Sequence, residues 1–237
     1  MYDGSPRRDE LAARLATVRE RIDRACDAAG RSAEDVTLIA VTKFFPASDV
    51  AILAELGVHD VGENRDQEAS AKVDELPPEV RDRLTVHFVG QLQSNKAGHV
   101  ARYADVVQSV DRPKIARALD RAAAAADRRL EVLLQVDLSG AAGRGGVAPE
   151  AARALADEVA ESEALRLRGV MAVAPLGEDP APAFERLAGV AHAIREGHPD
   201  ADWMSAGMSG DLEQAVAAGA THLRVGSAIL GSRPLAR

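Results

Sequence analysis

Apolar residues along this chain alternate between two patterns, one typical of buried strands and one typical of amphipathic helices. Short runs rich in β-branched residues, such as 36–43, predict strands. Between them lie segments such as 8–29, in which Leu11, Leu15 and Val18 recur at helical spacing. The predicted strands are 36–43, 58–62, 84–90, 105–110, 130–138, 166–174, 202–208 and 222–226, and the predicted helices are 8–29, 47–56, 65–75, 94–103, 112–127, 149–161, 180–196 and 211–218.

This strand–helix alternation predicts an α/β protein with a parallel sheet, because parallel neighbours need a crossover connection. Eight such units and one extra amino-terminal helix favour a single (β/α)8 barrel domain over residues 1–237, with 1–7 as a flexible tail. An open doubly wound sheet is the alternative. The residues at the carboxyl ends of the predicted strands, many of them polar, favour the barrel, where those ends converge on one face. They are Lys43, Glu63, Asn64, His87, Asp137, Met171, Ser205 to Ser209 and Arg224 to Ser227.

The amino-acid composition argues against several classes of function. The chain has 237 residues, a net charge of −8 and only 3% aromatic residues. Nucleic-acid or anionic-membrane binding is therefore not expected, because both need basic surfaces and base stacking needs aromatic side chains. A single cysteine, Cys26, excludes a disulfide within the chain and fits the cytoplasm; we expect it to be a small buried apolar residue. The sequence shows no signal peptide and no apolar run long enough to span a membrane.

Lys43 is the first candidate for chemistry. It closes the first predicted strand, at the end where α/β folds place their active sites. A lysine amine that is desolvated there has a lowered pKa and can form a Schiff base. Taken alone, the position is more typical of a solvated lysine where a strand enters a loop.

The last two predicted strands both run into small hydrogen-bonding residues. Ser209 precedes the helix 211–218, and Gly226 and Ser227 follow the final strand. Backbone N–H groups at such turns favour an anion, and barrels often bind phosphate after their last two strands. The alternative is that Ser209 is an N-cap and the glycines serve tight turns.

Two further polar residues fall within strands. Arg224 has the same parity as Gly226, so we expect it to face the barrel interior, where an arginine needs an acceptor. His87 faces opposite to Phe88, and a lone strand histidine is more often structural than catalytic. No His, Cys or carboxylate set has metal-ligand spacing, so no metal is expected.

Together these residues resemble one family. The motifs are Ala40-Val41-Thr42-Lys43, Gly62-Glu63-Asn64, His87-Phe88-Val89-Gly90 with Gln91-Leu92-Gln93-Ser94-Asn95-Lys96, Arg168-Gly169-Val170-Met171, Gly207-Met208-Ser209 with Asp211, and Arg224-Val225-Gly226-Ser227-Ala228-Ile229. In this order, over roughly residues 9–233, they are similar to the YggS/PROSC family of pyridoxal-5′-phosphate (PLP) homeostasis proteins.

The resemblance implies a barrel like the amino-terminal domain of alanine racemase, with PLP held on Lys43 as an internal aldimine. It also implies that Ser209, Gly226 and Ser227 hold the phosphate, that Arg224 faces the pyridine nitrogen, and that Asn64, His87 and Met171 line the site. The expected role is intracellular PLP (vitamin B6) homeostasis, with an indirect effect on amino-acid and keto-acid balance. The resemblance also implies a monomeric protein whose partners are PLP itself and apo forms of PLP-dependent enzymes.

Three departures from the family pattern concern Ser227, Gln91 and Arg144. Threonine is usual at position 227, proline at 91, and a lysine near Arg144 in the loop 140–146. Ser227 keeps the hydroxyl, whereas an arginine at 144 cannot form a second aldimine.

The resemblance favours a PLP holder over an enzyme. Racemases need a second base opposite the lysine, and in alanine racemase it is a tyrosine held in place by an additional β-domain. Tyr2 and Tyr103 fall on the expected tail and on a predicted helix, and the expected barrel lacks such a β-domain. A weak PLP-dependent racemase and a Schiff-base aldolase without PLP remain the alternatives.

Overall fold

The computed structural model describes residues 6–140 and 145–232, and its strands close into a (β/α)8 barrel. The strands are β1 (Thr37–Val41), β2 (Asp60–Glu63), β3 (Thr85–Phe88), β4 (Val106–Val110), β5 (Leu130–Gln135), β6 (Leu165–Met171), β7 (Trp203–Ser205) and β8 (His222–Val225). Each pairs in parallel with the next, and β8 returns to β1 with Thr37 opposite His222. The expected barrel is thus confirmed, and the open sheet is not observed.

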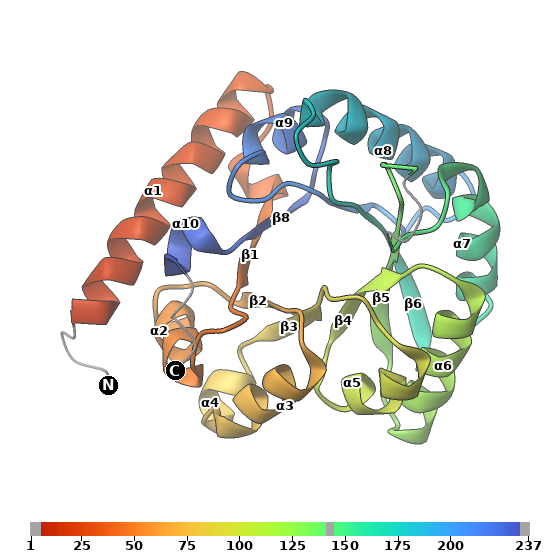
Figure 1. The fold of residues 1–237 in the computed structure, drawn as a ribbon, viewed down its shortest axis with the longest axis horizontal. Coiled ribbons are helices and arrows are strands. Elements are labelled where there is room, and N and C mark those ends of the chain that lie inside the picture. The colour runs from red at the N-terminus through yellow and green to blue at the C-terminus, as the bar shows by residue number, and fades with distance from the viewer. Residues whose placement is uncertain (1–5, 141–144, 233–237) are drawn as a thin grey trace.

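Helices cover the outside of the barrel (Figure 1). They are α1 (Pro6–Ala28), α2 (Ala47–Glu55), α3 (Asp66–Glu75), α4 (Pro78–Arg81), α5 (Ala97–Tyr103), α6 (Pro113–Ala125), α7 (Ala152–Ala160), α8 (Pro180–Arg195), α9 (Leu212–Ala217) and α10 (Ser227–Leu230), with short 3-10 turns η1 (Ala33–Asp35), η2 (Ser94–Lys96) and η3 (Pro149–Ala151). The sequence pattern did not indicate α4 or α10, each of which has only four residues.

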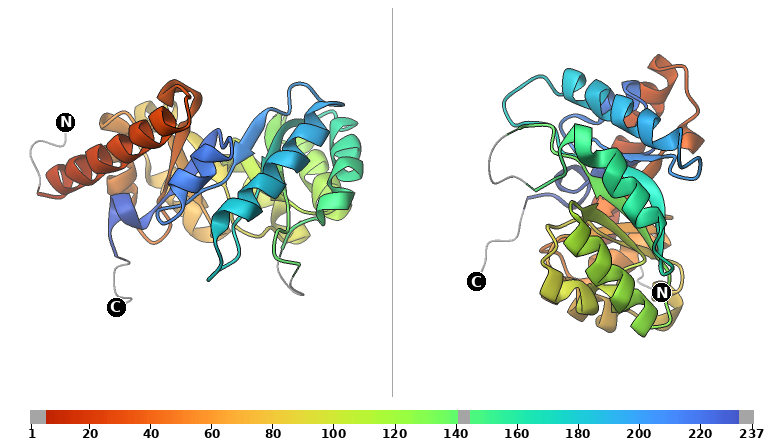
Figure 2. Two further views of the ribbon diagram at one scale, coloured as in Figure 1. Left: turned by 90° about the horizontal axis from the view of Figure 1, so that it is seen from above. Right: turned by 90° about the vertical axis from the view of Figure 1, so that its right-hand side faces the viewer.

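The extra helix α1 packs against α9 and α10 and runs along the outside of the barrel (Figures 1 and 2). It begins at Pro6, so the prediction of a tail through residue 7 is wrong for residues 6 and 7. The Arg7 guanidinium explains the difference, because it donates to Asp49 of α2 at 2.6 Å and to the Leu230 carbonyl of α10 at 3.1 Å. Cys26 is fully buried on this helix, as expected.

Most apolar side chains lie between the strands and the helices, where they form the main core. Inside the barrel the apolar cluster is small and consists of Val106, Leu133 and Met171, with Trp203 packed against it. Polar side chains occupy other buried interior positions, including His87, Gln108, Ser205, His222 and Arg224. Barrels usually fill this space with branched apolar residues, so the polar interior indicates a function.

Candidate functional site

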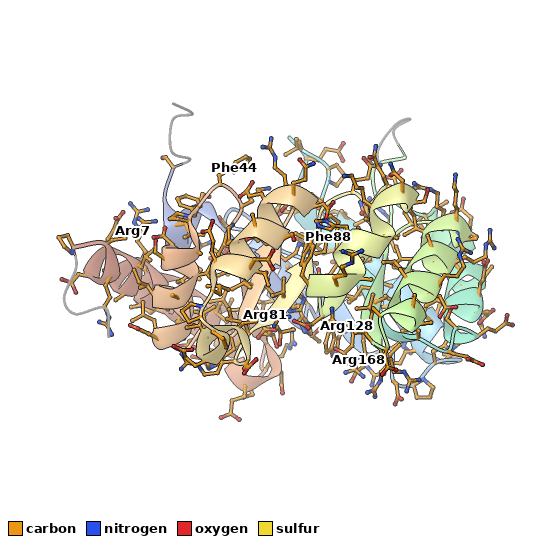
Figure 3. All side chains as sticks on the ribbon, turned by 90° about the horizontal axis from the view of Figure 1, so that it is seen from below. Arg7, Phe44, Arg81, Phe88, Arg128 and Arg168 are labelled. Atoms are coloured by element: carbon orange, nitrogen blue, oxygen red, sulfur yellow. The ribbon has the colours of Figure 1, made fainter. Side chains whose placement is uncertain are left out.

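A cavity of about 510 Å³ opens at the carboxyl ends of the strands. Seven of the eight site residues expected from the sequence line it, and only His87 does not. The lining residues are Val41, Lys43, Phe44, Phe45, Asn64, Val89, Gly90, Gln91, Gln135, Met171, Val173, Met208, Ser209, Gly210, Arg224, Gly226, Ser227, Gly231 and Ser232. Phe44 marks this end of the molecule in Figure 3, and Arg128 and Arg168 mark the opposite end.

Lys43 lies two residues beyond the end of β1, in a turn that is held in place by hydrogen bonds to the preceding residue, Thr42. The carbonyl of Thr42 accepts a hydrogen bond from the Lys72 ammonium at 2.8 Å, and its hydroxyl donates to Glu63 at 2.6 Å. Lys72 and Glu63 form a buried ion pair at 2.6 Å. Phe44 has a φ of +72°, which is unusual for a side chain of this size and turns the chain sharply after the lysine. These contacts hold Lys43 at the cavity wall.

Ser209 and Ser227 come from different loops and meet at the wall of the cavity. The two hydroxyls lie 3.3 Å apart, and the backbone N–H of Ala228 donates to Ser209 Oγ at 3.3 Å. The N-cap of α9 is Asp211, so Ser209 is not simply a capping residue. Arg21 of α1 donates to the Ser209 carbonyl at 3.1 Å, and α1 therefore supports this hydroxyl pair.

Arg224 reaches the cavity from the barrel interior and is only 5% exposed. Its guanidinium donates to Ser205 Oγ and to the Ala172 carbonyl, both at 2.7 Å. Burial lowers the pKa of Arg224 to about 10, with Asp211 opposing that shift. The side chain therefore carries its charge at neutral pH, and it presents a fixed cation at the floor of the site.

Asn64 and Met171 complete the wall. Asn64 Oδ1 is buried and has no hydrogen-bond partner among the described residues. The backbone at Gly90 passes very close to the backbone of Asn64, since a Cβ on Gly90 would lie 2.1 Å from the Asn64 backbone carbonyl oxygen. Only glycine fits at position 90, and the contact fixes Asn64 against the loop after β3. A buried acceptor without a partner is what a bound molecule with a donor group would satisfy.

His87 differs from the expectation that it lines the site. It is fully buried below the cavity, where its ring lies between Asp60 Oδ1 at 2.9 Å and Gln108 Nε2 at 3.0 Å. His87 and Phe88 project from opposite faces of β3, as their alternation predicted, but the depth of His87 in the barrel was not predicted. Sequence reasoning noted Ser205 at a strand end without giving it a role, and it missed Gln108, although inward parity on β4 was a usable signal.

Other expectations concern groups away from the cavity. Arg144 lies outside the described residues. Tyr103 lies on α5, where burial and the nearby Asp66 raise the pKa of its hydroxyl. No group of three or more His, Cys, Asp or Glu side chains within residues 6–140 and 145–232 could hold a metal ion. Over the same residues, no helix is long and apolar enough to cross a membrane.

Comparison with known proteins gives the family. The profile described as "Alanine racemase, N-terminal domain" matches residues 14–234. A pyridoxal phosphate homeostasis protein of Mycobacterium tuberculosis is 46% identical over 250 residues, covering 97% of this chain and 95% of that protein. The chain belongs to the pyridoxal phosphate homeostasis protein family. The resemblance inferred from the motifs is therefore confirmed.

A second homeostasis protein and one solved structure extend the comparison. The protein from Escherichia coli K12 is 39% identical over 228 residues and covers 95% of this chain and 97% of its own length. A solved structure of PipY from Synechococcus elongatus, with PLP bound, superimposes with a TM-score of 0.79 at 34% identity, covering 93% of this chain and all of that one. The family likeness thus extends over nearly the whole barrel.

Proposed function

We propose that this protein binds PLP covalently through Lys43 and acts in PLP homeostasis as a holder of the cofactor rather than as a turnover enzyme. The family supports this proposal, and PipY, which is 34% identical, was solved with PLP bound. The observation that carries it is the convergence on one cavity of an amine, a buried cation and a pair of hydroxyls, from Lys43, Arg224 and Ser209 with Ser227.

The residues present fit the chemical groups of PLP. An amine at Lys43 suits the aldehyde, and the Ser209 and Ser227 hydroxyls with the Ala228 N–H suit the phosphate. A Cβ on Gly226 would lie 3.3 Å from the Val41 carbonyl oxygen, so glycine keeps this side of the cavity open. The volume of about 510 Å³ lies within the range of small-molecule sites.

Bound PLP supplies an aldehyde for covalent attachment and an electron sink whose strength depends on protonation of its ring nitrogen. We assign Arg224 to that nitrogen. Because Arg224 carries its charge at neutral pH, it disfavours a second positive charge on the ring. The arginine therefore weakens carbanion chemistry and favours storage of the cofactor.

The surroundings of Lys43 also favour a holder. Racemization needs a second base on the face opposite the lysine, and no tyrosine of the described residues lines the cavity. Among the residues that the structure describes, Tyr103 is the one tyrosine; it lies on the outer helix α5, with its hydroxyl 3.4 Å from Asp66 Oδ1. Delivery of PLP to apo forms of PLP-dependent enzymes is the cellular role that this arrangement suits.

The first test is the visible absorption of the purified protein after addition of PLP. We expect a lysine-bound cofactor band in the wild type and in Lys96→Ala, and none in Lys43→Ala. Lys96 is the matched control because it is a surface lysine outside the cavity lining. A band that survives Lys43→Ala would refute the covalent assignment. A wild type that gains no band would favour an aldolase without PLP.

The second test concerns the phosphate. Ser227→Ala should weaken PLP binding by about 1.5–3 kcal/mol, the value of a hydrogen bond to a charged group, and Ser209→Ala should do the same. Ser227→Thr keeps the hydroxyl and should bind almost as well as wild type. Equal dissociation constants for all of these variants would contradict the assignment.

The third test separates a holder from an enzyme. The PLP-loaded protein is incubated with single L-amino acids, and the D-enantiomer is measured. We expect no D-amino acid beyond the molar amount of protein. Sustained inversion over many turnovers would refute the holder proposal and establish a racemase.

A further inference from the structure

A continuous line of hydrogen bonds crosses the barrel interior beneath the cavity. It starts at Arg224 and ends at Asp60, which is the first residue of β2 and therefore lies at the amino-terminal end of that strand, away from the cavity. We refer to these five residues as the Arg224 chain: Arg224 to Ser205 at 2.7 Å, Ser205 to Gln108 at 2.8 Å, Gln108 to His87 at 3.0 Å, and His87 to Asp60 at 2.9 Å.

The Arg224 chain is buried over most of its length. His87, Gln108 and Ser205 are fully buried, and Arg224 is 5% exposed. The far end differs, because the Asp60 side chain is 25% exposed. The Asp60 carboxylate at the end of the Arg224 chain is therefore in contact with solvent, whereas Ser205, Gln108 and His87 are shielded from solvent.

The chemistry of the groups fixes the direction of every bond. Arg224 can only donate, so Ser205 Oγ accepts from it and donates its own hydrogen to Gln108 Oε1. The amide nitrogen of Gln108 then donates to His87 Nδ1, which leaves the ring hydrogen on Nε2. His87 Nε2 donates to the Asp60 carboxylate. All donors point away from Arg224, which is the arrangement that satisfies every link when the histidine is neutral and the Asp60 carboxylate is ionised.

Arg224 depends on this arrangement for its orientation. The two acceptors of its guanidinium, the Ser205 hydroxyl and the Ala172 carbonyl, are both uncharged. A buried cation without a carboxylate partner is held only by such polar contacts. Loss of the Ser205 hydroxyl would leave one guanidinium N–H and Gln108 Oε1 without partners inside the barrel.

We propose that the Arg224 chain is a positioning device, in which Ser205, Gln108, His87 and Asp60 hold the Arg224 guanidinium in one orientation toward the ring of the bound cofactor. This inference rests on the proposed function, because it takes PLP as the occupant of the cavity. None of these four residues lines the cavity, so they act on the cofactor through Arg224 alone. A fully satisfied polar network in place of an apolar interior specifies such an orientation.

The test compares Ser205→Ala with Ser109→Ala. Ser109 is the matched control, because it is 2% exposed and its hydroxyl has no hydrogen-bond partner among the described residues. Two quantities are measured on the full-length protein: the dissociation constant for PLP and the wavelength of the lysine-bound cofactor band. If Ser205 acted only on the stability of the fold, its replacement would not shift the wavelength of this band. Ser205→Ala should bind PLP about 10-fold more weakly, as expected for one lost hydrogen bond to a charged group, and shift the band. Ser109→Ala should match wild type in both.

Asp60→Asn is the second variant, because it removes the carboxylate charge at the solvent-exposed end of the Arg224 chain. It should shift the band in the same direction as Ser205→Ala, by less, and it carries the test if Ser205→Ala does not fold. If wild type binds PLP but Ser205→Ala behaves like Ser109→Ala, the positioning inference alone is wrong. If Ser205→Ala does not fold and Asp60→Asn matches wild type, the inference is also wrong. If wild type gains no band, the proposed function fails and the inference with it.

Discussion

Replacing Lys72 with methionine should destabilise the protein strongly, although Lys72 lies outside the cavity. Its ammonium is 2.6 Å from Glu63 and 2.8 Å from the Thr42 carbonyl, and the two charged side chains are 7% and 2% exposed. Methionine fills a similar volume but leaves the Glu63 carboxylate buried without a cation. Removing one partner of a buried pair costs about 3–5 kcal/mol. The melting temperature should fall by roughly 6–20 °C, at about 2–4 °C per kcal/mol for a chain of this size.

The loss should depend on pH in a defined direction. Burial raises the pKa of the Glu63 carboxyl above its ordinary value of 4.5, and Lys72 opposes that shift. Without Lys72 the folded-state pKa rises further, so the folded protein retains a proton that the unfolded chain releases. The loss of stability is therefore smallest in acid, below the ordinary pKa, and grows as the pH rises toward the folded-state value. It should be larger at pH 8 than at pH 5.

Urea unfolding at both pH values measures the effect, with two further variants as controls. Lys96→Met removes a solvent-exposed lysine 3.7 Å from Asp66 and should cost about 0–1 kcal/mol. The double variant Lys72→Met with Glu63→Gln removes both buried charges and should recover most of the stability. A loss no larger than that of Lys96→Met, or a double variant as unstable as the single one, would refute the reasoning. Because the pair also holds the Thr42 carbonyl, Lys72→Met should loosen the turn and weaken covalent binding of PLP.

Two more predictions concern stability. Gly90→Ala places a Cβ 2.1 Å from the Asn64 carbonyl oxygen and should cost about 3 kcal/mol or more by thermal unfolding, whereas Gly98→Ala, in open space on α5, should stabilise by about 0.5–1 kcal/mol. His222 has its pKa lowered from 6.5 to about 3 by burial and then by nearby His87, so the unfolded chain binds a proton that the folded protein does not. Stability from this group is complete above pH 6.5 and is lost as the pH falls toward 3, with about 3 kcal/mol lost by pH 4. Unfolding at pH 7 and pH 4 should therefore show a smaller loss of stability in acid for His222→Gln than for wild type. Equal losses would contradict the burial of a neutral His222.

The alternating pattern of strands and helices was enough to predict the barrel, because each parallel strand needs a crossover helix and eight units close a sheet. It also placed Lys43, Ser209 and Arg224 at one face, since the carboxyl ends of parallel strands meet there. The expected ends of the strands were less accurate: β1 stops at Val41, not at residue 43. The polar residues that follow an apolar run belong to the loops that form the cavity.

The family resemblance supplied the identity of the cofactor, and the structure then decided which residues share the cavity. Sequence parity gives the face of a strand from which a side chain projects, and it correctly placed His87 opposite Phe88. Parity does not tell how deep in the barrel the side chain lies, because that depth depends on the register between strands, such as the pairing of His87 with Gly62. Only that stagger places His87 beneath the cavity and in line with Gln108.

The sequence by itself therefore determined the fold class, the cavity end of the barrel and most of its polar lining, all of which follow from local periodicity and strand direction. Tertiary structure alone decided the contacts between residues far apart in the chain. Lys72 of α3 reaches the turn that carries Lys43, and Ser205 of β7 links Arg224 to Gln108 of β4. Such contacts depend on how elements stagger and pack in three dimensions, and no spacing along the sequence encodes them.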